Sequence, residues 1–203
     1  MVPQIIYDFD PRHLPDDILA AIGLVATCSA QTEDVVEQGI SACLGIDFEY
    51  GAAITTHMSS PLRDHVLRAV AEIRINDLDD LDDLDSLLDQ INAAFGKRNS
   101  YVHRGWCRHP TTGACFTVMT SARGRVETDL VPVTVTHILE DAQFIYKAGM
   151  DLQTFLMKRK LYPKTPPAGR NRFHKSKVAR KKRRKAMRAA QSTGGTPDDL
   201  AGQ

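Results

Sequence analysis

Apolar residues recur every three or four positions in four stretches of the chain, the spacing that places side chains on one face of a helix. The stretch over residues 77–102 shows this spacing most clearly. The same spacing predicts helices at residues 14–45, 61–75 and 136–161. The stripes are Ile18, Ile22, Val25, Cys28 or Ser29, Val36, Ile40, Cys43 and Leu44; Leu62, Val66, Val70 and Ile73; Leu81, Leu84, Leu88, Ile91 and Phe95, followed by Arg98 and Val102; and Ile138, Ala142, Ile145, Gly149, Leu152 and Leu156.

Proline and small polar residues indicate where these helices begin and end. Pro15 and Pro61 each stand in a first turn, where a missing N–H costs nothing, and Thr136 is the predicted N-cap of the last helix. Residues 45–60 show no sustained period, so we expect them to be irregular. Gly23 lies inside the first helix, where close approach of a neighbouring helix would account for it.

After the third predicted helix the period changes to that of a strand. β-branched and aromatic residues alternate with others over residues 106–109, 115–120 and 125–131, separated by glycine-containing turns. This pattern predicts a β-hairpin or three-stranded meander inserted at about residues 106–131, covering the end of a bundle with Trp106 as its anchor. The sequence therefore predicts a mainly α fold, a four-helix up-and-down bundle with a small β insert.

The formal net charge of +1 conceals an acidic body and a basic tail. Residues 1–157 hold 11 Lys/Arg and 23 Asp/Glu, a charge of −12, whereas residues 158–188 hold 15 Lys/Arg and no acid. We expect the C-terminal tail to be disordered beyond a Pro-rich linker. The predicted segments are an extended lead over residues 1–13, with Ile5, Ile6 and Tyr7 as anchors, a helical domain over residues 14–162, and the linker and basic tail over residues 163–203.

The basic tail has two interpretations. Its cations would bind nucleic-acid phosphates through counterion release, which depends on salt but not on sequence. Alternatively, the tail is a solvated extension that folds back on the acidic body or contacts a membrane surface. A helix over residues 180–191 would be positive nearly all round, which argues against a membrane-lying helix with an apolar face. The residues predicted to bind nucleic acid are Lys175, Lys177, Arg180, Lys181, Lys182, Arg183, Arg184, Lys185 and Arg188.

An acidic run over residues 77–85 resembles a metal site, but its spacing argues otherwise. Leucines at every third position put the aspartates on the outer face, and negative charge is favourable at a helix N-terminus. The run has neither the glycine turn nor the distal glutamate of a calcium loop. We therefore predict a solvated face, which would also offer a docking surface to the basic tail.

Four cysteines in a chain without a secretory signal indicate reduced thiols in a cytoplasmic protein. No run approaches 18 apolar residues, so we expect no membrane span. Cys107 and Cys115, with His103 and His109, suggest a zinc site, but Cys-x7-Cys is not a standard knuckle and strand positions explain both cysteines. We expect neither a metal nor a cofactor.

The apolar stripe of the third predicted helix ends in a polar pair, Arg98 and His103. Arg98 takes the stripe position after Phe95, where a guanidinium is unfavourable unless an acceptor meets it or the site opens to solvent. Glu33 and Asp34 are candidate acceptors. Arg98 and His103 lie about 140° apart on an ideal helix, so they converge only if the helix frays between them or a second chain supplies the partner. On residue types alone, Arg98 snorkels and His103 covers a helix end.

Residues 98–103, Arg-Asn-Ser-Tyr-Val-His, resemble the signature of the HEPN superfamily (higher eukaryotes and prokaryotes nucleotide-binding). That signature is an arginine, a polar residue such as asparagine, and a histidine four to six residues after the arginine, at the end of a helix in an all-α bundle. The resemblance extends over residues 12–160. It implies a metal-independent endoribonuclease that acts as a dimer on RNA, in some cases a toxin with an antitoxin-like partner. It assigns His103 as general acid or base, Arg98 as stabiliser of the phosphorane, and Asn99 as an orienting group.

A non-catalytic alternative stays open. Many proteins that resemble this superfamily are described only as binding or dimerisation modules, so Arg98 and His103 would hold a structural network or a nucleotide. Tyr101 either stacks on a base or packs at the helix end. Arg104, Trp106 and strands follow the motif, so the insert either blocks or shapes the cleft. The charge of the body disfavours RNA unless the tail compensates.

Overall fold

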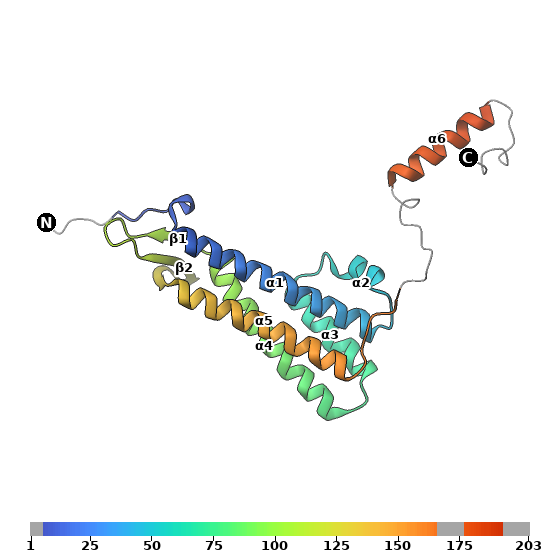
Figure 1. Ribbon diagram of the computed structural model, residues 1–203, viewed down its shortest axis with the longest axis horizontal. Helices are drawn as coiled ribbons and strands as arrows, with labels where there is room; N and C mark the ends of the chain where they lie inside the picture. The colour runs from blue at the N-terminus through green and yellow to red at the C-terminus, as the bar shows by residue number, and fades with distance from the viewer. Residues whose placement is uncertain (1–5, 166–176, 193–203) are drawn as a thin grey trace. The chain divides into compact units, whose positions relative to one another are not determined.

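The computed structural model describes residues 6–165 and 177–192, which belong to two units that are described separately, Met1–Thr165 and Pro166–Gln203. The first unit is mainly α with a small three-stranded antiparallel sheet, which confirms the predicted fold class at this level (Figure 1). Its elements are the 3-10 helix η1 (Pro11–His13), α1 (Asp16–Cys43), α2 (Phe48–Thr55), α3 (Ser60–Arg74), α4 (Leu78–Val102), β1 (Gly105–Arg108), β2 (Cys115–Arg123), β3 (Arg125–Val133) and α5 (Val135–Lys158).

The core lies between α1, α4 and α5, the three long helices of this unit, with α3 packed on α1 and α4. Their predicted stripes are buried: Val25, Ile40, Leu84, Leu88, Ile138, Ile145 and Leu152 are at most 1% exposed. Leu44, just past the end of α1, and Val102, the last residue of α4, are predicted stripe residues that are exposed, at 43% and 40%. The three-and-four spacing therefore identifies the buried faces of the long helices correctly.

Helices α1 and α5 come into close contact at Gly149. A Cβ placed there would lie 2.6 Å from Oγ1 and 3.2 Å from Cα of Thr32. The Thr32 hydroxyl shares its proton between the carbonyl oxygens of Cys28 (3.0 Å) and Ile145 (3.1 Å). By contrast, nothing lies within 4 Å of a Cβ placed at Gly23, so the predicted close approach there is wrong.

Helix α2 occupies part of the segment that we predicted to be irregular. Asp47 begins it, because its carboxylate accepts a hydrogen bond from the backbone N–H of Tyr50 at 3.1 Å. Eight residues make barely two turns, too few for the apolar period to emerge. Thr134, not Thr136, caps α5, since its hydroxyl oxygen accepts the His137 N–H at 3.3 Å. The prediction was therefore two residues late.

The predicted stripe of α3 is wrong at both of its ends. Leu62 and Ile73 are 47% and 85% exposed, whereas Arg63, Leu67 and Ala71 are the buried residues of this helix. The buried face is displaced by one position because it includes an arginine, which a pattern of apolar residues assigns to the solvent side. The partners that make this burial possible are carboxylates on α1.

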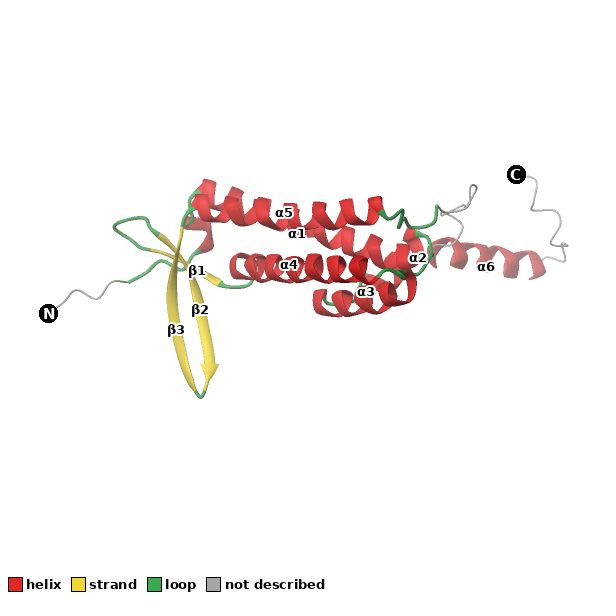
Figure 2. Cartoon of the chain, turned by 90° about the horizontal axis from the view of Figure 1, so that it is seen from below, coloured by secondary structure: helices red, strands yellow, loops and turns green. Residues whose placement is uncertain are grey.

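The inserted sheet is a meander in the order β1-β2-β3, which confirms the predicted insert. Trp106 pairs across β1 and β2 with Thr117, and both side chains are buried. The indole Nε1–H donates to the carbonyl oxygen of Tyr101 at 2.9 Å, and the two rings stack at 6.3 Å. The insert is thus anchored to the end of α4, as predicted. Strands β2 and β3 are nine residues long and β1 is four, so the ribbon of β2 and β3 projects beyond β1 (Figure 2).

The N-terminal lead runs along the free edge of β1. Asp8 pairs with Arg108 through N–H···O hydrogen bonds of 3.0 and 2.8 Å. Tyr7 makes edge contacts with the rings of His109 and Phe116, which confirms it as an anchor. Ile6 is 80% exposed, so it does not anchor the lead. Ile5, the third predicted anchor, lies outside the described part of the chain.

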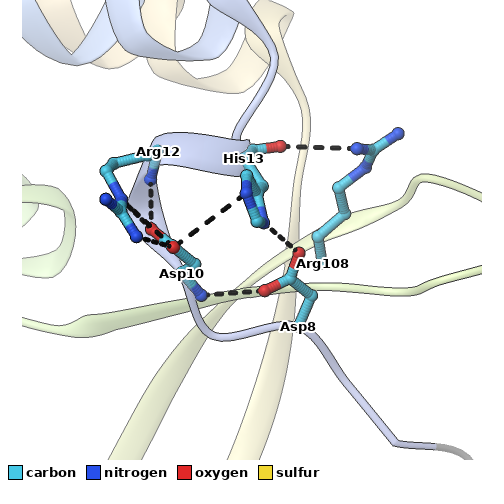
Figure 3. Close-up of polar contacts among 5 residues, drawn as sticks. All are labelled: Asp8, Asp10, Arg12, His13 and Arg108. Atoms are coloured by element: carbon cyan, nitrogen blue, oxygen red, sulfur yellow. Dashed lines mark hydrogen bonds and ion pairs between the residues drawn. The ribbon is translucent and has the colours of Figure 1, made fainter.

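Two carboxylates hold the lead in place (Figure 3). Asp8 accepts from the N–H of Asp10 (2.9 Å) and contacts His13 Nδ1 (2.8 Å), which together lower its pKa below the ordinary value. Asp10 accepts from Arg12 Nη2 (2.6 Å) and from the Arg12 N–H (3.0 Å), and these bonds lower its pKa to about 2. Arg108 also donates to the carbonyl oxygen of His13 at 3.4 Å. The backbone on both sides of residue 9 is therefore fixed.

The second unit contains α6 (Lys177–Ser192), so the prediction of a disordered tail is wrong for this segment. Alanine, lysine, arginine and methionine dominate it, and it contains neither glycine nor proline, a composition that favours helix. Residues 166–176 and 193–203, with the predicted contact residue Lys175, lie outside the described residues.

Helix α1 is the one described helix whose length and apolar composition would suit a membrane crossing. The expectation of no span rested on uninterrupted apolar runs, and average hydropathy gives this different result. Core helices satisfy the same test, and α1 lines the core of the first unit.

Candidate functional site

The last turn of α4 brings Arg98, Asn99 and His103 together. The helix ends at Val102, and His103 is its C-cap, with its N–H bonded to the Asn99 carbonyl oxygen at 3.2 Å. Because the chain leaves the helix there, the imidazole turns back toward Arg98. Arg98 Nη1 lies 3.0 Å from His103 Nε2 and donates to Asn99 Oδ1 at 2.9 Å. One chain therefore suffices for the convergence, because the helix ends between Arg98 and His103.

The contact between Arg98 and His103 constrains the state of the imidazole. A guanidinium has donors only, so Nε2 must be the acceptor, and the ring is then neutral with its proton on Nδ1. This assignment follows from the hydrogen-bond pattern. Arg98 occupies the lone pair of Nε2, so the guanidinium has to turn away before that nitrogen can bind another group.

Glu33 of α1 is a partner of Arg98, and it is one of the two acceptors that the sequence predicted. Its Oε1 accepts from Arg98 Nη2 at 3.4 Å, a long contact, and its Oε2 accepts from Arg63 Nη1 at 3.0 Å. Asp34, the other candidate, is exposed and makes no contact with Arg98 in the described structure. The carboxylate of Glu33 thus joins two arginines.

Arg63 is a residue of this network that the sequence analysis did not identify. Its Nη2 pairs with Glu37 Oε1 at 3.0 Å, and its Nε donates to the Thr55 carbonyl oxygen at 3.3 Å. A line of charges thus runs from Arg98 through Glu33 and Arg63 to Glu37, across α4, α1 and α3. Exposed side-chain fractions fall from 26% at Arg98 to 10% at Arg63, so one end opens to solvent. In the sequence, this network could have been found from Glu33 and Glu37, two acids one helical turn apart on α1 that call for a basic partner.

A groove opens directly beside His103, with a volume of about 480 Å³. His103 is one of its walls, and the inserted sheet forms much of the remainder. The insert therefore shapes the surroundings of the site, one of the two alternatives that the sequence left open. The residues that line it are Phe9, His103, Arg104, Gly105, Val118, Met119 and Thr120.

Tyr101 packs inside the protein and is not available to stack on a base. It is 8% exposed, and its hydroxyl donates to Asp141 Oδ2 at 2.6 Å. Burial, together with this hydrogen bond, raises the pKa of Tyr101 well above the ordinary value. Lys97 Nζ lies 2.5 Å from the other oxygen of Asp141, so the same carboxylate fastens the last turns of α4 to α5.

The acidic run forms the predicted solvated face. Its aspartates are exposed or partly exposed, and several pair with arginines. Asp85 accepts from Arg68 at 2.6 Å, and Asp80 and Asp83 both pair with Arg159. These contacts join α4 to α3 and to the end of α5.

The cysteines are free and buried. Burial raises the pKa of the Cys107 and Cys115 thiols and raises that of Cys43 to about 11, which disfavours the thiolate that metals bind. Across residues 6–165 and 177–192, no three or more His, Cys, Asp or Glu side chains come together as metal ligands.

Helix α6 carries most of the residues predicted to bind nucleic acid. Residues 181–189 of this helix are exposed, and they include Lys181, Lys182, Arg183, Arg184, Lys185 and Arg188. A dense set of exposed cations suits a phosphate backbone.

Comparison of the chain with protein-family models, with curated proteins and with solved structures yields no significant match. The arguments for function therefore depend on the residues and geometry described above.

Proposed function

We propose that this protein is a metal-independent endoribonuclease similar to HEPN enzymes, acting in the cytoplasm as a homodimer whose two copies of the Arg98–Asn99–His103 site face one another. The four long or medium helices that surround the core, α1, α3, α4 and α5, would correspond to the HEPN bundle. The observation that carries the proposal is the 3.0 Å contact between Arg98 Nη1 and His103 Nε2 at a partly open site.

The chemistry is a transesterification within the RNA. The 2′-oxygen attacks the adjacent phosphorus while His103 Nε2 takes the 2′-OH proton. The bond from phosphorus to the 5′-oxygen then breaks, and that oxygen takes a proton from a second acid, for which the dimer offers the imidazolium form of His103 of the second subunit, released from its own Arg98. The products are a 2′,3′-cyclic phosphate and a 5′-hydroxyl, so no metal is needed to generate the nucleophile.

Arg98 would stabilise the charge that develops on the phosphorane. Guanidinium groups bind phosphate oxygens through two N–H donors, and the 3.4 Å contact of Arg98 with Glu33 is weak enough to exchange for such a ligand. When Arg98 turns to phosphate, it releases Nε2 of His103. Asn99 would hold either the guanidinium or the substrate through its amide.

The exposed cations of α6 would supply RNA affinity without sequence preference. The body carries a charge of −12, which repels RNA, and the cations of residues 158–188 offset this. We therefore expect binding to weaken steeply as salt rises.

The decisive experiment is RNA cleavage in EDTA by the wild type and by His103→Ala. We expect the variant to lose about 10²–10⁴-fold in rate, the usual contribution of a general acid–base residue. His57→Ala, which removes another exposed histidine, is the matched control and should cleave as the wild type does. Equal rates in wild type and His103→Ala would contradict the assignment.

A specific observation also favours a non-catalytic function. Both Nη atoms of Arg98 are engaged within the chain, by Asn99, His103 and Glu33, as in a network that only stabilises the end of α4. On this alternative the protein is a dimeric binding module that α6 tethers to nucleic acid or to a partner. Absence of cleavage across varied RNAs would support it. If the protein is instead a toxin with an antitoxin-like partner, expression should arrest growth and His103→Ala should relieve the arrest.

A further inference from the structure

The groove beside His103 presents apolar side chains to solvent. Phe9 is 59% exposed and Met119 is 36% exposed, and both line it. Exposed aromatic and thioether surface in a concave site is a recurring property of ligand-binding grooves. A volume of about 480 Å³ is within the range of small-molecule sites.

Polar contacts hold Asp8 and Asp10 (Figure 3), the residues on either side of Phe9. Asp8 pairs with Arg108 in the sheet and contacts His13, while Asp10 is bonded to Arg12. An exposed ring therefore stands at a fixed place, and a ligand that packs on it would lose little entropy to ordering. The same contacts compensate the charges of the two carboxylates, which would otherwise repel an anion.

Arg104 supplies the polar component of the groove. It follows His103 directly and lines the same wall, and it forms no ion pair with any residue in the described part of the chain. This distinguishes it from Arg98, Arg63 and Arg68, which all have carboxylate partners. A guanidinium without an acidic partner, beside an exposed ring, suits a ligand that combines a planar base with a phosphate.

We propose that this groove binds one nucleobase of a single-stranded RNA, stacked on Phe9, with Arg104 on the adjoining phosphate. The placement of this base next to the bond that is cut rests on the proposed function. The binding of a nucleobase in the groove does not depend on that function. The β insert and the N-terminal lead would thus belong to the substrate site.

The test measures the affinity of the full-length protein for a short 2′-O-methylated RNA, which lacks the 2′-OH nucleophile and so reports binding alone. Raised salt would suppress the contribution of the basic tail while leaving stacking largely intact. We expect Phe9→Leu to weaken binding about tenfold, because leucine offers no aromatic face on which a base can stack. Phe9→Trp keeps an aromatic face and should retain wild-type affinity. Phe48→Leu, which removes an exposed aromatic ring from α2, is the matched control.

The outcomes separate this proposal from the ribonuclease. Equal affinities for Phe9→Leu and the wild type, or a wild type that does not bind the oligonucleotide, would overturn the nucleobase site even if unmodified RNA is cleaved. Conversely, binding that depends on Phe9 in a protein that cleaves no RNA would support the site and refute the enzyme. Because Phe9 is exposed, its variants should fold, and unchanged thermal unfolding would verify this.

Discussion

Two arginines share the carboxylate of Glu33 and differ in almost everything else. Arg63 is 10% exposed, has a second carboxylate in Glu37 and donates to a backbone carbonyl oxygen. Arg98 is 26% exposed and lies 3.4 Å from Glu33, and its other partners are a neutral amide and an imidazole. The difference indicates that Arg63 maintains the fold, whereas Arg98 remains free to exchange its partners for a ligand.

Removing Arg63 should have the largest effect on stability. Arg63→Ala would leave two partly buried carboxylates without their partner, so we expect a loss of about 3 kcal/mol in the free energy of unfolding. Arg98→Ala should cost about 1 kcal/mol or less. Chemical denaturation of both variants measures the contrast, and equal losses would show that the two arginines have the same structural role.

Replacing Arg98 by lysine should affect activity and leave stability nearly unchanged. Lysine keeps the charge but cannot bind a phosphate through two donors in a fixed plane, so we expect about a 100-fold loss in the rate of RNA cleavage. The free energy of unfolding should change by less than about 0.5 kcal/mol. A variant that lost stability in proportion to activity would show that Arg98, like Arg63, mainly stabilises the fold.

Gly149→Ala tests whether Arg98 depends on the position of α1. The new Cβ would meet Thr32, the residue before Glu33, so the variant should lose about 1–3 kcal/mol of stability and some alignment of the carboxylate. Gly23→Ala, on the open side of α1, is the control and should gain about 0.5–1 kcal/mol. Thermal unfolding and cleavage rates measure both, and a stable, fully active Gly149→Ala protein would contradict the close contact.

Acid should release the N-terminal lead as Asp10 takes up a proton. The pKa of Asp10 is lowered to about 2 by Arg12, so its contribution is complete above the ordinary value of 3.8 and is lost as pH falls through 2. NMR spectra between pH 4 and pH 2 should show changes at Asp10 and Arg12, and Asp10→Asn should abolish them. An unchanged Arg12 side-chain signal across this window would refute the effect.

The sequence predicted correctly the helices whose buried faces are apolar and regularly spaced. The prediction failed where a buried face includes a charged residue or where a helix is too short to show a period. The stripes of α1, α4 and α5 were identified because their buried faces are almost wholly apolar. The stripe of α3 was not, because burial of Arg63 depends on acids that are 26 and 30 residues away in the sequence. α2 was too short to show a period. The sequence offered a helix over residues 180–191 only as an alternative to a disordered tail, because the segment has few apolar residues to form a buried stripe.

The site could be predicted in part. Arg98, Asn99 and His103 are close in sequence, so the end of the helix alone brings them together. Glu33 was a candidate because an arginine on an apolar stripe requires an acceptor. Phe9 could not be found, because only the pairing of its neighbour with β1 carries it across the fold to the groove.

The ribbon of β2 and β3 has a further consequence for how the protein behaves at high concentration. Where it projects past β1, its outer edges offer unpaired N–H and C=O groups that another strand could join. Arg125, Glu127 and Asp129 alternate along β3, and Pro132 withholds a donor near its end. Charged side chains and a proline disfavour the addition of a further strand to a sheet edge, so the edge of β3 is a poor template for pairing with another chain.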